Sequence, residues 1–79
     1  MRKVIIGKKY RHFKGNIYKV IDIVNDSESE GNKLKKVVIY EAEYGEHLRW
    51  ARSYDMFISK VDKKKYPDSN QTYRFEKID

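Results

Sequence analysis

Residues 34–44, LKKVVIYEAEY, carry the clearest structural signal in this chain. Alternate side chains in this stretch are apolar and form one face: Val38, Tyr40, Ala42 and Tyr44. Successive side chains of a β-strand point to opposite sides of a sheet, so this period of two predicts a strand. Residues 16–24, NIYKVIDIV, are β-branched and aromatic and predict a second strand, apolar on most of both sides.

Shorter segments on either side extend this pattern. An opening segment at 10–13 precedes the two main strands, and residues 47–51, 57–61 and 73–78 predict further short strands. Gly15-Asn16 and Gly45-Glu46 mark tight turns, because glycine reaches positive φ without steric cost. Residues 51–56 are too few for a helix of normal length and predict one 3₁₀-like turn. A helix over 41–56 is the alternative, but Gly45 interrupts it and no helical stripe emerges.

These elements predict an all-β protein. About five short strands cannot remain a stable flat sheet, since both faces and both edges would be exposed. We therefore expect a small SH3-like barrel of about five antiparallel strands with a 3₁₀ turn, forming a single domain over residues 1–79. A chain of 79 residues buries only about 60 % of its unfolded surface, which excludes a deep enclosed active site.

Charge is distributed unevenly along the chain. There are 18 Lys and Arg against 12 Asp and Glu, a formal net charge of +6. Residues 1–24 hold seven basic side chains against one acidic, residues 25–47 three against six, and residues 48–79 eight against five. This asymmetry predicts a basic face and an acidic face, which matters for the choice of partner.

The cellular setting is inferred from what the sequence lacks. Without cysteine the chain has no disulfide, no thiolate zinc site and no thiol nucleophile, which is typical of a reducing compartment. The longest apolar run, residues 37–40, is far below the ~20 residues that span a bilayer, and no signal peptide core is visible. We expect a cytoplasmic protein with no membrane contact.

A family resemblance covers nearly the whole chain, from about residue 10 to residue 78. The segment YRHFKGN at 10–16 resembles the opening of the bacterial family labelled domain of unknown function 1653. Later blocks match in order: Tyr18, Val20, Ser27-Glu28, Val38-Ile39-Tyr40, Ala42, Tyr44-Gly45-Glu46, Trp50, Arg52, Met56-Phe57 and Arg74-Phe75. Three positions depart from the family: Asp26 stands where His is common, Glu43 where Leu is common and Ser53 where Pro is common. The resemblance implies an SH3-like β-barrel and no established activity.

The most basic stretch supplies the first candidate site. Its cations are Lys8, Lys9, Arg11, His12 and Lys14, interleaved with Tyr10 and Phe13. Cations that meet phosphates and flat rings on which bases stack are what a nucleic-acid surface needs. Alternation would separate Arg11 and Phe13 from the side that carries His12. The structural alternative is a solvated strand whose lysines keep the protein soluble.

Trp50 and Arg52 form the second candidate site, two residues apart on one predicted strand face. An Arg beside an aromatic plane can stack on a base or grip an anion through two nitrogens. The structural alternative makes Trp50 the largest core ring, which we expect for a lone tryptophan, and pairs Arg52 with Glu41, Glu43 or Glu46. Several tyrosines could likewise close the core with their hydroxyls at the rim, or line a shallow groove: Tyr10, Tyr18, Tyr40, Tyr44 and Tyr54.

No pattern indicates catalysis. The serines and the two histidines, His12 and His47, lack a nucleophile-elbow context, and no metal-ligand spacing is present. We expect no enzyme activity, no catalytic residue, no metal and no cofactor. The interpretation is a non-catalytic binding module whose binding residues are Lys9, Arg11, His12, Lys14, Trp50 and Arg52, with nucleic acid as the partner. The alternative is a protein, peptide or small-ligand module that uses an aromatic groove; the sequence leaves the oligomeric state open.

Overall fold

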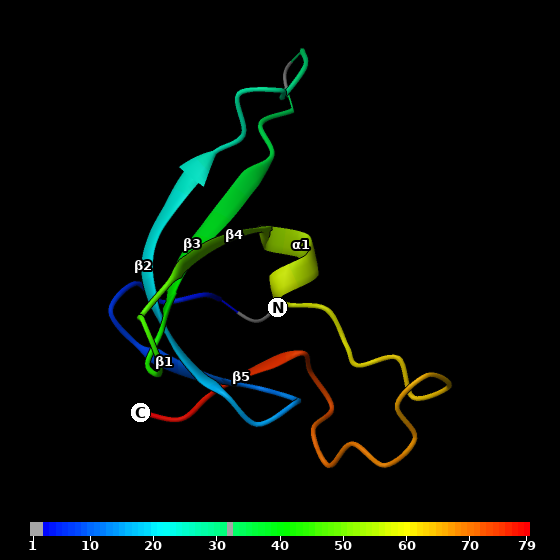
Figure 1. The fold of residues 1–79 in the computed structure, drawn as a ribbon. Helices are drawn as coiled ribbons and strands as arrows, with labels where there is room; N and C mark the ends of the chain where they lie inside the picture. Colours follow the sequence, from blue (N-terminus) through cyan, green and yellow to red (C-terminus); the bar gives the residue numbers. More distant parts are fainter. Residues whose placement is uncertain (1–2, 32) are drawn as a thin grey trace.

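The structure, a computed structural model, describes residues 3–31 and 33–79 and consists mainly of one antiparallel sheet. Its strands are β1 (Lys9–His12), β2 (Ile17–Asn25), β3 (Lys36–Ala42), β4 (Arg49–Ser53) and β5 (Phe75–Lys77). They lie in the order β4-β3-β2-β1-β5 (Figure 1). The predicted all-β class with about five antiparallel strands is therefore confirmed.

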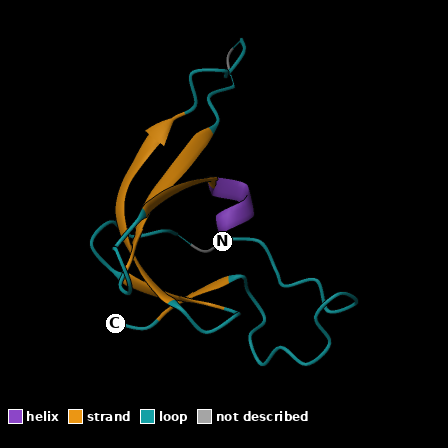
Figure 2. Cartoon of the chain, in the orientation of Figure 1, coloured by secondary structure: helices purple, strands orange, loops and turns teal. Residues whose placement is uncertain are grey.

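The sheet curls without closing. Its register shifts between Val20 and Asp22, an irregularity of the kind that bends a strand. Figure 2 shows the strands curving around a short helix, α1 (Tyr54–Phe57), while the chain between α1 and β5 loops away from the sheet. β4 and β5 stand at opposite ends of the strand order and do not pair. The SH3-like barrel of the sequence analysis is therefore not confirmed, because the sheet stays open between these two strands.

Two predicted local elements are wrong. The expected 3₁₀ turn over 51–56 is the end of β4 followed by an α-helical turn, whose N-cap Ser53 accepts a hydrogen bond from the Met56 amide at 3.2 Å. A serine cap, followed by an acidic residue in the first turn, favours this helical start. The expected strand at 57–61 is irregular chain with a single bridge from Lys60 to Tyr73.

Aromatic rings dominate the core on the concave side of the sheet. Val38, Tyr40 and Ala42 are buried, which confirms three of the four members of the face predicted from residues 34–44; the fourth, Tyr44, is exposed. On β2, Val20 alone is fully buried. Phe57 of α1 stacks flat on Phe75 of β5, with ring centroids 4.1 Å apart. This stack joins the helical turn to the last strand. Among the described residues, no helix has the length or the apolar character needed to cross a membrane.

Candidate ligand pocket

A pocket of about 310 Å³ opens on the concave side, between the two unpaired ends of the sheet. Five elements supply its walls: the end of β1 and the turn after it, β2, β3, β4, and the chain that enters β5. The lining residues are His12, Phe13, Lys14, Tyr18, Tyr40, Trp50, Arg52, Tyr66, Arg74 and Phe75. The pocket therefore lies at the gap between β4 and β5, where the sheet does not close into a barrel.

A tight turn places the first part of the wall. The Gly15 amide donates to the His12 carbonyl at 2.7 Å, and the His12 amide donates to the Asn16 carbonyl at 2.8 Å. Gly15 has φ of 108°, a conformation that other residues rarely adopt. This turn ends the strand alternation after His12, so Phe13 and Lys14 both reach the pocket on the same side as His12.

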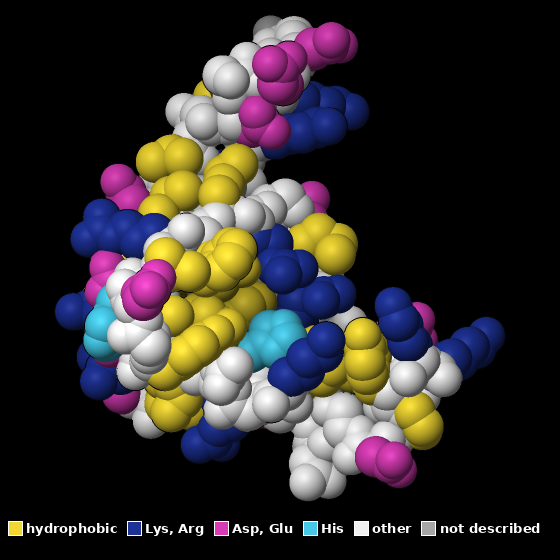
Figure 3. All heavy atoms as spheres, in the orientation of Figure 1, with side chains coloured by type: hydrophobic (Ala, Val, Ile, Leu, Met, Phe, Trp, Pro, Cys, Tyr) yellow, Lys and Arg dark blue, Asp and Glu magenta, His cyan; other side chains and the backbone are white. Residues whose placement is uncertain are grey.

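The pocket is lined by six Phe, Tyr and Trp rings and three Lys and Arg side chains, and none of its lining residues is acidic. Figure 3 shows this face as hydrophobic side chains beside Lys and Arg, around a histidine ring. Among the described residues, the ion pair of the structure joins Arg49 to Glu41 at 2.8 Å, on the other side of β4. The structural alternative that pairs Arg52 with Glu41, Glu43 or Glu46 therefore finds no support, because Glu41 pairs with Arg49 and the Nε atom of Arg52 bonds the Tyr40 hydroxyl.

Arg52 and Arg74 are held by neutral partners. The Nε atom of Arg52 donates to the Tyr40 hydroxyl at 3.3 Å, and its guanidinium carbon lies 5.9 Å from the Phe75 ring centroid. The Nε atom of Arg74 donates to Ser59 Oγ at 3.2 Å. These contacts orient each guanidinium but do not neutralise its positive charge. An oriented guanidinium without a carboxylate partner is suited to bind an anion.

His12 lies between these cations as a neutral ring. Burial, followed by the charges of Arg52, Arg74 and Lys14, lowers the pKa of His12 from 6.5 to about 4. Its Nδ1 accepts a hydrogen bond from the Lys14 amide at 3.1 Å, so the proton of the neutral imidazole is on Nε2. Near neutral pH, His12 is therefore an uncharged hydrogen-bond donor packed against the Phe75 ring at 4.9 Å.

Tyr18 closes the pocket beside His12. Its hydroxyl lies 2.9 Å from the hydroxyl of Tyr44, and burial, followed by this hydrogen bond, raises the pKa of Tyr18 to about 12. The phenol is thus protonated at physiological pH and adds no negative charge to the pocket. The hydroxyls of Tyr10 and Tyr54 accept hydrogen bonds from the amides of Ile5 and Val4, and the Tyr10 side chain is buried.

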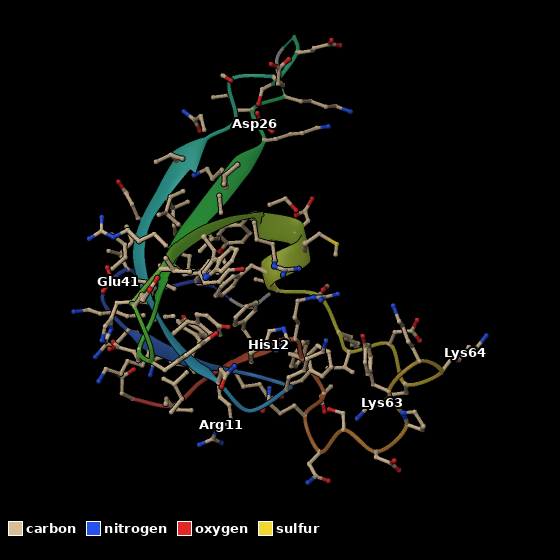
Figure 4. The ribbon with its side chains drawn as sticks, viewed as in Figure 1. Arg11, His12, Asp26, Glu41, Lys63 and Lys64 are labelled. Atoms are coloured by element: carbon tan, nitrogen blue, oxygen red, sulfur yellow. The ribbon has the colours of Figure 1, made fainter. Side chains whose placement is uncertain are left out.

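The structure brings together four of the six residues that the sequence singled out. His12, Lys14, Trp50 and Arg52 line the pocket, whereas Lys9 and Arg11 do not. Figure 4 shows Arg11 pointing away from the concave side on which His12 lies. Trp50 is 49 % exposed, so the expectation that it forms the core is wrong.

Sequence reasoning missed Tyr66 and Arg74 as site residues. Tyr66 follows three lysines in the loop before β5. An aromatic residue directly after a basic run was the sequence signal that could have identified it as a binding residue. Arg74 directly precedes the buried Phe75 and was noticed only as part of the family resemblance. Among the described residues, no three side chains of the types that bind metals come together.

Comparison with known proteins gives a family and no activity. Searches of the curated proteins and of the solved structures found no match for this chain. A family model described as protein of unknown function (DUF1653) matches residues 8–77. That range contains every residue of the pocket. The chain therefore belongs to the DUF1653 family.

Proposed function

We propose that this chain is a non-catalytic module that binds single-stranded nucleic acid, with one base in the pocket and the adjacent phosphates on Arg52, Arg74 and Lys14. The observation that carries the proposal is the composition of the pocket wall: six aromatic rings, three cations and no carboxylate. The partly exposed rings provide stacking surfaces for a base, namely Phe13, Tyr18, Trp50 and Tyr66, whereas Tyr40 and Phe75 are buried. The cations neutralise the phosphates of its strand. The formal net charge of +6 adds a long-range attraction for polyanions.

Single strands suit the pocket better than a duplex. A base in a duplex is stacked and paired, so its faces are unavailable unless it is turned out of the helix. The pocket rings come from different elements and meet mostly at steep angles, for example 84° between Tyr18 and Tyr40. Such a concave wall accommodates one unstacked ring and offers no flat surface for the side of a double helix.

The test is a titration of fluorescein-labelled oligothymidylate, as a single strand and as a duplex with its complement, followed by anisotropy at about 20 mM and about 200 mM salt. Single strands are expected to bind more tightly. With three cations on phosphates, the slope of log affinity against log salt is expected to be about −2. The absence of saturable binding at the lower salt concentration would end the proposal.

A matched pair of double variants separates pocket contacts from general attraction. Arg52→Gln with Arg74→Gln removes two charges from the pocket, and Lys9→Gln with Arg11→Gln removes two outside it. The first pair is expected to reduce affinity by at least about tenfold, since charge-assisted contacts are lost. The second is expected to cause a much smaller loss. Equal losses would mean that net charge alone attracts the ligand.

A small-ligand or peptide module is the second candidate function. The volume favours it to some degree, because about 310 Å³ lies at the lower end of the range for small-molecule sites. Under this alternative, the fluorescence of Trp50 responds to a free nucleotide or an acidic peptide and is indifferent to oligonucleotide length.

A further inference from the structure

A second cavity, of about 330 Å³, adjoins the pocket. Its lining residues are Phe13, Lys14, Lys65, Tyr66, Pro67, Asp68 and Ser69. Phe13, Lys14 and Tyr66 line both cavities. The two spaces are therefore neighbours with a common wall.

The common wall is a pair of crossed rings with a cation beside them. The centroids of Phe13 and Tyr66 lie 4.8 Å apart with the rings inclined at 61°. The Nζ atom of Lys14 lies 5.4 Å from the Tyr66 centroid and 5.9 Å from that of Phe13. Among the described residues, Lys14 is thus the cation that lines both cavities.

We infer that the two cavities hold two successive nucleotides, with the phosphodiester that joins them bound by Lys14. This inference rests on the proposed function and specifies its ligand as a two-nucleotide unit. Adjacent bases in a bound single strand occupy adjacent aromatic sites, and their connecting phosphate lies between them. Two bases in adjacent cavities place their connecting phosphate at the boundary, where the positive charge of Lys14 lies.

The second cavity differs chemically from the first in a way that suits a base more than a phosphate. Tyr66 and Pro67 offer apolar surface, and the Nζ atom of Lys65 lies 5.6 Å from the Tyr66 ring centroid. Asp68 adds a carboxylate, which repels phosphate and accepts hydrogen bonds from the exocyclic amines and ring N–H groups of bases. We therefore place a base in this cavity and its phosphate at the boundary.

Isothermal titration calorimetry with three probes tests the two-nucleotide unit. The probes are thymidine monophosphate, thymidine bisphosphate (pTp) and the dinucleotide pTpT. The bisphosphate adds charge without a second base, so it is the control for electrostatics. The dinucleotide is expected to bind at least about tenfold more tightly than the bisphosphate, because a stacked base contributes that much.

Two lysine variants locate the second nucleotide. Lys65 lines the second cavity and not the first, whereas its neighbour Lys64 lines neither. Lys65→Gln is expected to weaken pTpT binding severalfold and to leave thymidine monophosphate binding unchanged, while Lys64→Gln changes neither. Equal effects of Lys65→Gln and Lys64→Gln on pTpT would overturn the assignment of the second cavity.

The outcomes distinguish this inference from the function on which it rests. Equal affinity for pTpT and pTp, within about twofold, overturns the two-nucleotide unit and leaves single-strand binding intact. No binding of pTpT, together with no binding of a longer oligothymidylate at low salt, overturns the proposed function itself. Tighter binding of pTpT that is sensitive to Lys65→Gln supports both.

Discussion

The guanidinium of Arg52 lies over the ring of Phe75, 5.9 Å from its centroid, although the two residues belong to the strands at opposite ends of the sheet. No strand pairing joins β4 to β5. A cation–π contact spans the opening instead, and it leaves the guanidinium plane at the edge of the pocket. The open sheet and the cationic wall of the pocket are therefore two aspects of one arrangement.

Replacing Arg52 by Lys tests whether this arrangement matters for binding. Lys keeps the charge but loses the planar group that covers Phe75 and the Nε atom that donates to Tyr40. We expect the affinity for single-stranded oligothymidylate, measured by anisotropy, to fall roughly fivefold. Arg49→Lys is the matched control on the same strand, because Arg49 faces Glu41 and lies outside the pocket. A similar loss in both variants would contradict a specific role for Arg52.

Phe57→Ala is expected to destabilise the fold strongly, and Trp50→Ala only slightly. Phe57 is 1 % exposed and stacks on Phe75, so its removal should cost about 3 to 5 kcal/mol, comparable to the whole stability of a small domain. Trp50 is 49 % exposed, so its removal should cost about 1 kcal/mol or less.

Urea unfolding followed by circular dichroism measures these costs, and anisotropy of labelled oligothymidylate measures binding. Trp50→Ala is expected to stay folded and to lose at least about fivefold in affinity, since one stacking surface of the pocket is gone. An unfolded Trp50→Ala would mean that this ring supports the fold after all.

The sequence predicted burial well on an inner strand of the sheet and poorly on an edge strand. Alternation in residues 34–44 grouped Val38, Tyr40, Ala42 and Tyr44 on one face. The first three are buried because they lie on β3, an inner strand paired on both sides, whereas Tyr44 lies beyond the end of β3 and is exposed. Alternation also placed Trp50 and Arg52 on one face of β4. It could not tell whether that face would be covered, since β4 is an edge strand and its cover depends on residues far along the chain.

The pocket itself depends on contacts that no local pattern encodes. Tyr66 and Arg74 come from the long irregular segment between α1 and β5, whose path is fixed by distant hydrogen bonds such as that from the Arg74 amide to the Ser59 carbonyl at 2.8 Å. The sequence predicted the turn at Gly15 but not its effect on the direction of the Phe13 side chain. By ending the alternation the turn sends Phe13 to the same side as His12.

Stability is expected to fall as the pH is lowered from about 6.5 to about 4, with a contribution from His12. The pKa of His12 is about 4 in the folded chain and 6.5 for the ordinary side chain. Between these values the unfolded state binds a proton that the folded state does not, so acid favours unfolding. Burial of the ring disfavours the proton most, followed by the positive charges of Arg52, Arg74 and Lys14.

The measurement is the urea midpoint at several pH values for the native chain and for His12→Gln. Carboxylates titrate in both proteins, so the difference between the two curves isolates the histidine. The native midpoint is expected to decline more steeply below pH 6.5 than that of the variant. Parallel curves would show that His12 keeps an ordinary pKa.

Ligand binding is expected to respond to acid in the opposite direction. A phosphate among Arg52, Arg74 and Lys14 offsets the positive charge around His12 and so raises its pKa in the complex. Where the complex binds a proton that the free chain does not, lower pH strengthens binding. We expect the affinity for oligothymidylate to rise as the pH falls toward the free-chain pKa of about 4, and this rise to be absent in His12→Gln. Phosphodiesters and thymine do not titrate in this interval, so the change would belong to the protein. An affinity that stays constant or decreases would place the phosphates away from His12.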